Sequence, residues 1–133
     1  MKKKYTTIVV YAALVFCILC ATAYADPIVP YADSEFSRAY INLLDNKIVS
    51  VYATTYDTKD QISIDSIWLE EKVDGSWTYS TSLSALSSTV YNTRSFFFTS
   101  NYSNKIGTGT FRIGCTYDAD GYKITRYSNE QSY

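Results

Sequence analysis

The sequence predicts an all-β protein, a single antiparallel β-sandwich of about seven strands that follows a helical export signal. Apolar and polar residues alternate with a period of two in several segments, as they do in strands with one buried face. Turn-forming Asp, Asn and Gly residues recur between these segments. After residue 25, no segment shows a sustained helical periodicity. We therefore expect strands and turns throughout the rest of the chain.

Residues 1–25 have the three parts of a secretory signal peptide. Three lysines stand near the start, an apolar run extends from Ile8 to Ala21, and the small residues Ala23 and Ala25 precede a cleavage site before Asp26. The apolar run is about 14 residues, shorter than the roughly 20 that cross a bilayer as a helix. We therefore predict cleavage and release outside the cell, with no membrane contact afterwards. An uncleaved anchor and a lipoprotein signal are the less favoured alternatives.

The 108 residues that remain of the 133 are enough for one domain and too few for two. Residues 26–35 contain both prolines and are predicted to form a flexible leader, and residues 36–133 the β-sandwich domain. Without the three lysines of the signal, nine basic and 13 acidic residues give a formal charge of −4. This charge argues against binding of nucleic acid, which depends on neutralising phosphates. Histidine is absent, which excludes a His-dependent triad and a His-ligated metal, and we predict no cofactor.

The first two predicted strands are Phe36–Leu44 and Lys47–Tyr56, joined by a turn at Asp45-Asn46. Each has an apolar face. The residues on these faces are Ala39, Ile41 and Leu43 in the first strand and Val49, Val51 and Ala53 in the second, where they alternate with Ser50, Tyr52 and Thr54. The polar residues 57–60 are predicted to be a connection.

The third predicted strand, Ile62–Val73, changes phase near Asp65-Ser66, which predicts a bulge or bend. Asp74-Gly75 is a strong hairpin turn, and Trp77–Ser82 is the expected partner strand. The remaining segments are a serine-rich crossover at Leu83–Val90, a strand at Asn92–Thr99, a loop at Asn101–Gly107, a strand at Thr110–Tyr117, a turn at Asp118–Gly121 and a last, possible edge strand at Tyr122–Asn129. Seven short strands at this spacing are typical of an immunoglobulin-like or fibronectin-III-like sandwich.

Two segments carry a resemblance to fibronectin-III-like domains. Gly109-Thr-Phe-Arg-Ile-Gly-Cys115, with Gly121 and Ser128-Asn-Glu130, resembles their closing hairpin, and residues 67–77 resemble their middle hairpin. The whole arrangement is similar to small exported single-domain proteins of unknown function from Gram-positive bacteria. The resemblance implies fold and export but no activity. Phe111 stands where such domains often carry a tyrosine whose hydroxyl bonds to the backbone, so we expect that corner to be built differently.

Trp68, Trp77 and Tyr79 are the predicted ligand-binding residues. Trp77 and Tyr79 share one face of their strand. Trp68 is opposite in parity to Ile67 and Leu69, so either Trp68 or those two aliphatic residues face away from the core. Exposed tryptophan and tyrosine stack on sugar rings or anchor protein interfaces. The alternative is that these residues merely suit strands and fill the core.

Other candidate sites are weaker. Asp118-Ala-Asp120-Gly121 resembles the first half of a calcium loop but lacks the remaining ligands, so we predict an ordinary turn and no metal site. Cys115 has no histidine to activate it and shares a face with apolar residues, so we predict a buried, inert thiol. If it were exposed, it could form an intermolecular disulfide. Asn101-Tyr102-Ser103 matches a glycosylation acceptor, a weak three-residue match that we treat as chance if the source is bacterial.

Carboxylates offer no evident pair for acid–base catalysis. Glu70 and Glu71 are adjacent on a strand and therefore point to opposite faces. Asp65 and Glu130 form another conceivable pair, which the sequence does not bring together. The sequence therefore favours a secreted, non-catalytic binding module for an extracellular protein or glycan. A carbohydrate-binding module that uses exposed Trp and Tyr, a small carboxylate-dependent hydrolase and a secreted effector are the alternatives.

Overall fold

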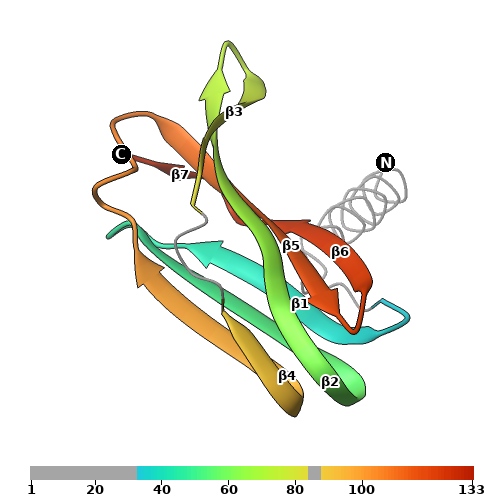
Figure 1. Cartoon of the computed structure of the whole chain (residues 1–133). Coiled ribbons are helices and arrows are strands. Elements are labelled where there is room, and N and C mark those ends of the chain that lie inside the picture. The colour runs from blue at the N-terminus through green and yellow to red at the C-terminus, as the bar shows by residue number, and fades with distance from the viewer. Residues whose placement is uncertain (1–32, 84–87) are drawn as a thin grey trace, which may run out of the picture.

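The structure is a computed structural model that describes residues 33–83 and 88–133. The predicted signal, with Ala23, Ala25 and Asp26, and most of the predicted leader lie outside the described residues. The described chain is all-β, without helices, and its seven strands form one curled antiparallel sheet (Figure 1). The strands are β1 (Phe36–Leu43), β2 (Ile48–Val73), β3 (Ser76–Ser82), β4 (Thr89–Asn101), β5 (Thr110–Ala119), β6 (Tyr122–Tyr127) and β7 (Gln131–Ser132).

The 26-residue strand β2 organises the whole sheet. Its first part pairs with β1 on one side and β4 on the other, and its second part pairs with β5 and β3. Between these parts β2 turns back on itself (Figure 1). The pairing of β2 with β4 skips from Thr54 to Lys59 at this corner. The sheet therefore folds over, and β1 packs against β5 and β6 across the core.

The predicted connection at residues 57–60 is wrong, because these residues continue strand β2. Asp57, Thr58 and Asp60 are exposed at the outside of the corner, so their polarity reflects exposure to water rather than a break between strands. The second and third predicted strands are consequently one. The seventh strand is β7, whose two residues pair with Thr110 and Phe111 of β5. It lies beyond the last predicted strand, Tyr122–Asn129.

Other local predictions are confirmed. The register of β2 against β5 shifts between Ile64 and Ser66, where the phase of the sequence changes. Asp74 and Gly75 form the turn between β2 and β3, and both have positive φ, 51° and 81°. This backbone is typical of the two-residue turn that matches the twist of a hairpin. One boundary is wrong: β4 begins at Thr89 rather than Asn92, so the last two residues of the predicted crossover at Leu83–Val90 belong to a strand.

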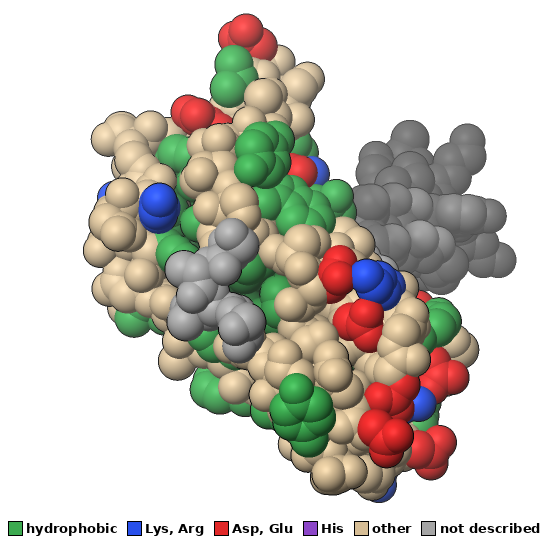
Figure 2. All heavy atoms as spheres, in the orientation of Figure 1, with side chains coloured by type: hydrophobic (Ala, Val, Ile, Leu, Met, Phe, Trp, Pro, Cys, Tyr) green, Lys and Arg blue, Asp and Glu red, His purple; other side chains and the backbone are tan. Residues whose placement is uncertain are grey.

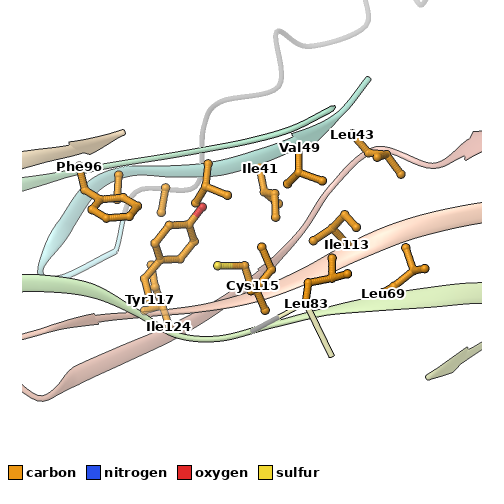
Figure 3. Close-up of a cluster of buried hydrophobic side chains, with 14 of the residues drawn as sticks. Ile41, Leu43, Val49, Leu69, Leu83, Phe96, Ile113, Cys115, Tyr117 and Ile124 are labelled. Atoms are coloured by element: carbon orange, nitrogen blue, oxygen red, sulfur yellow. The ribbon is translucent and has the colours of Figure 1, made fainter. Parts of the chain in front are cut away.

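The core lies between the two parts of the folded sheet (Figure 3). Alternate residues of β1, β2 and β5 point into it, as the period-two pattern predicts. The labelled core residues in Figure 3 are Ile41, Leu43, Val49, Leu69, Leu83, Phe96, Ile113, Cys115, Tyr117 and Ile124.

Two buried tyrosines tie the backbone together inside this core. The Tyr117 hydroxyl donates to the Tyr40 carbonyl oxygen at 2.7 Å and so links β5 to β1. The Tyr102 hydroxyl donates to the Leu83 carbonyl oxygen at 3.3 Å. Phe111 is buried and packs against the Tyr133 ring, with 6.5 Å between centroids. Tyrosine–backbone bonds therefore exist in this chain, but at other positions than Phe111.

Candidate functional site

The outer surface of the folded sheet carries aromatic side chains in two separate places. The face drawn in Figure 2 shows hydrophobic side chains in distinct patches, with acidic side chains crowded at the end where β2 bends. One aromatic group lies over β3, β2, β5 and β6 and includes the predicted binding residues. The other lies over β1, β2 and β4.

Trp68 points outward from β2, because its neighbours Ile67 and Leu69 are buried in the core. It pairs in register with Gly114 of β5. The indole lies so close over this glycine that a Cβ built there would be 2.3 Å from the ring. The Tyr127 ring meets the indole edge-on, at 6.1 Å and 88°. Trp68 is therefore half-buried, with one ring face against the backbone of the chain.

Trp77 takes part in a stack of rings and cations across the same outer face. The Arg112 guanidinium lies 4.5 Å from the Trp77 ring centroid and 4.2 Å from that of Tyr127. The Lys72 ammonium lies 5.4 Å from the Trp77 ring. These distances are within the range of cation–π attraction. Arg112 thus bridges β3 and β6 through their aromatic side chains.

A single carboxylate, Glu70, fixes both parts of this arrangement. The Arg112 Nε donates to one oxygen of Glu70 at 2.6 Å, and the Trp68 Nε1 donates to the other at 3.0 Å. The Glu70 side chain is only 13% exposed, so this ion pair is partly shielded from water. We call Trp68, Trp77, Arg112, Tyr127 and Glu70 the tryptophan cluster.

Tyr79 lies beside the tryptophan cluster, opposite Glu70 in the register of β2 and β3. It is 62% exposed. The structure therefore brings all three predicted residues to one outer face. Because the rings of Trp68 and Trp77 are engaged by Gly114, Arg112 and Lys72, the geometry gives the two tryptophans a structural role. Tyr79 is the predicted residue that remains most open to a ligand.

The second aromatic group was not predicted. Tyr40 of β1, Tyr52 of β2 and Phe97 of β4 are paired in register across three neighbouring strands. The rings of Tyr40 and Tyr52 are 5.0 Å apart at 31°, and Phe97 is 67% exposed. We call these three residues the aromatic row. The alternation of Tyr52 with the buried Val51 and Ala53 predicts that Tyr52 points outward. That Tyr40 and Phe97 lie beside it depends on the register of three strands.

A hollow of about 430 Å³ adjoins the aromatic row at Tyr52. It is lined by Ser37, Arg38, Tyr52, Thr54, Thr55, Arg94 and Ser95. Two of these residues are arginines and none is acidic. The hollow therefore combines hydroxyl groups, positive charge and the side of a tyrosine ring.

The weaker candidates have structural roles. The Asp120 carboxylate accepts hydrogen bonds from the amides of Asp60 and Gln61, at 3.2 and 2.8 Å, and so ties the turn after β5 to β2. Asp118 accepts one from the amide of Gly121 at 2.7 Å, as in an ordinary turn. Within residues 33–83 and 88–133, no cluster of three or more His, Cys, Asp or Glu side chains could hold a metal ion.

Cys115 is fully buried, as predicted, and burial raises the pKa of its thiol to about 12. Such a thiol stays protonated and unreactive at neutral pH. The two other acids considered for catalysis each pair with a different lysine. Asp65 accepts from Lys123 at 2.7 Å and Glu130 from Lys72 at 3.0 Å.

Comparison of the chain with protein-family models, with curated proteins and with solved structures finds no match. Among the residues that the structure describes, there is no helix of the length and apolarity that crossing a membrane requires.

Proposed function

We propose that this protein is an exported, non-catalytic module that binds a ligand outside the cell, and that the ligand is a glycan. The secretory pattern of residues 1–25 supports export. We further propose that the curled sheet is a variant of the immunoglobulin-like or fibronectin-III-like sandwich. The seven antiparallel strands around one core support this assignment.

The observation that carries the binding proposal is the aromatic row. Three aromatic residues, paired in register on adjacent strands, face the same side of the sheet, and Tyr40 and Phe97 are 39% and 67% exposed. Neighbouring strands lie about 5 Å apart, so the row extends over about 10 Å. Such a row suits the apolar faces of successive sugar rings, which stack on aromatic side chains. No residue of the row takes part in the cation–π contacts that engage the tryptophan cluster.

A protein ligand is the alternative, since exposed rings also anchor protein interfaces. The two ligand classes differ in what they require of the surface. A glycan needs the ring faces themselves, whereas a protein interface also needs surrounding apolar area.

The test expresses the full chain in a secreting host and uses the protein recovered from the culture medium. It is mixed with bacterial cell-wall preparations and insoluble polysaccharides, and the bound fraction is measured after pelleting. We expect saturable retention that weakens about tenfold or more in Phe97→Ser or Tyr52→Ser. Tyr91→Ser is the matched control, because Tyr91 is equally exposed, at 66%, on the same strand as Phe97 but outside the aromatic row.

Retention that is the same in Phe97→Ser, Tyr52→Ser and the control would overturn this site. Loss in Trp77→Ala and Tyr79→Ala alone would move the binding surface to the tryptophan cluster. Absence of retention on every glycan, together with saturable binding to a surface protein, would assign the module to a protein partner.

A further inference from the structure

We propose that the glycan bound by the aromatic row is acidic, and that Arg38 and Arg94 bind its anionic groups in the adjoining hollow. This inference rests on the proposed function and adds the chemical class of the ligand. The sequence contains no basic run after the signal, but the fold brings these two arginines from β1 and β4 to the same hollow.

The two arginines stand out among the cations of the protein. Nine lysine and arginine residues lie in the described ranges. Five of them form ion pairs: Lys59, Lys72, Arg112, Lys123 and Arg126. Lys47 donates to the Ile106 carbonyl oxygen at 2.9 Å. Arg38, Arg94 and Lys105 form no ion pair or side-chain hydrogen bond with another described residue, and two of these three line one hollow.

The hollow continues the aromatic row rather than lying apart from it. Tyr52 belongs to both. Thr54 is the next residue after Tyr52 on the outer face of β2, and it pairs in register with Arg38 of β1. On its other side Thr54 pairs with Ser95 of β4, which is next to Phe97 on the same face. A sugar ring on Tyr52 would thus have the arginines at its edge. Anionic substituents project from the edges of sugar rings, so stacking and charge pairing are compatible.

The chemistry of the lining favours a carboxylate or sulfate. A guanidinium presents a planar fork of donors that matches two oxygens of such a group. The hydroxyl groups of Ser37 and Thr54 bond to each other at 2.9 Å, which holds the wall between β1 and β2 in place. Glu35, the acidic residue nearest to Arg38 in the sequence, pairs with Lys59 instead. Among the described residues no acid pairs with either arginine, which leaves both available to a ligand although the chain as a whole is acidic.

The experiment compares three polymers with one backbone: neutral dextran, carboxymethyl-dextran and dextran sulfate. Affinity electrophoresis of the protein secreted from cells that express the full chain measures retardation by each polymer. We expect retardation by the charged dextrans and little by the neutral one, with Kd rising about tenfold in Arg38→Gln or Arg94→Gln. Raising the salt concentration should weaken binding, because these charges are exposed. The two charged polymers distinguish a carboxylate from a sulfate ligand.

Lys105→Gln is the matched control, because Lys105 is the third cation without an ion pair among the residues that the structure describes and lies outside the hollow. Thermal unfolding of every variant checks that it folds. Unchanged binding of the charged dextrans in Arg38→Gln and Arg94→Gln, or equal weakening in Lys105→Gln, would overturn the inference. So would a lack of retardation by both charged dextrans. If any of these results is found but cell-wall retention still depends on Phe97, the proposed function stands and the glycan is neutral. If retention does not depend on Phe97 either, the inference and the proposed function both fail.

Discussion

The indole of Trp68 lies directly against Gly114, its neighbour in register on β5. Glycine in the interior of a strand often marks a place where another group approaches the backbone closely. Here that group is a half-buried ring on the outer face of the sheet. The contact lets Trp68 lie flat, with its N–H donating to Glu70 and its ring perpendicular to that of Tyr127.

Gly114→Ala should destabilise the protein by about 1–3 kcal/mol, the usual effect of adding a methyl group to a packed site. The new Cβ would lie 2.3 Å from the Trp68 ring, which must move. Urea unfolding followed by tryptophan fluorescence measures the change. Gly107→Ala is the control, because a Cβ there meets nothing within 4 Å. Equal stability of the two variants would contradict this account, whereas Trp68→Ala should reduce the effect of Gly114→Ala.

Arg112→Lys should cost about 1 kcal/mol although it keeps the charge. Lysine cannot place a planar group between Trp77 and Tyr127, nor reproduce the Nε hydrogen bond to Glu70. The free energy of unfolding and the near-UV circular dichroism of the tryptophans report this loss. In Arg94→Lys, which alters an arginine without ring or acid contacts among the described residues, both quantities should stay at the wild-type value. A stable Arg112→Lys variant with an unchanged spectrum would mean that charge alone matters at this position.

Much of the fold could be predicted because its signals are local. Period-two alternation identifies the buried faces of β1 and β5 and the first part of β2. The phase change at Asp65-Ser66 identifies the bulge, and Asp74-Gly75 the turn. The corner at residues 57–60 could not be recognised, because its polar residues resemble a loop although their backbone continues a strand. Strand β7 is too short to show any alternation.

The functional surfaces likewise contain some features that a local pattern predicts and others that depend on tertiary pairing. The outward direction of Trp68 follows from parity once Ile67 and Leu69 are placed in the core. The position of Arg112 between two rings requires the register of four strands. Arg38 and Arg94 line the same hollow because β1 and β4 flank the same part of β2. Such neighbours are set by tertiary pairing, which no local pattern contains.

Tyr117→Phe should lower the free energy of unfolding by about 1 kcal/mol, the usual net value of a hydrogen bond. The change removes only the hydroxyl that donates to the Tyr40 carbonyl oxygen across the core. Tyr127→Phe is the control, since the Tyr127 side chain is 48% exposed and its hydroxyl bonds to no described residue. Urea unfolding should distinguish the two variants. Equal stability would show that the Tyr117 hydroxyl contributes nothing beyond its ring.

The buried thiol of Cys115 should make the protein less stable at alkaline pH. Burial raises the pKa of this thiol from its ordinary 9.0 to about 12 in the folded protein. As pH rises above 9, the unfolded chain therefore loses a proton that the folded protein keeps. The free energy of unfolding must then fall with increasing pH. Burial also raises the pKa of Tyr117, which adds to the slope above the ordinary tyrosine value of 10.0. Urea unfolding between pH 7 and 11 measures this decline, and Cys115→Ala should make it shallower, whatever its own stability at pH 7. An identical slope with and without the thiol would mean that Cys115 ionises as readily inside the folded protein as outside it.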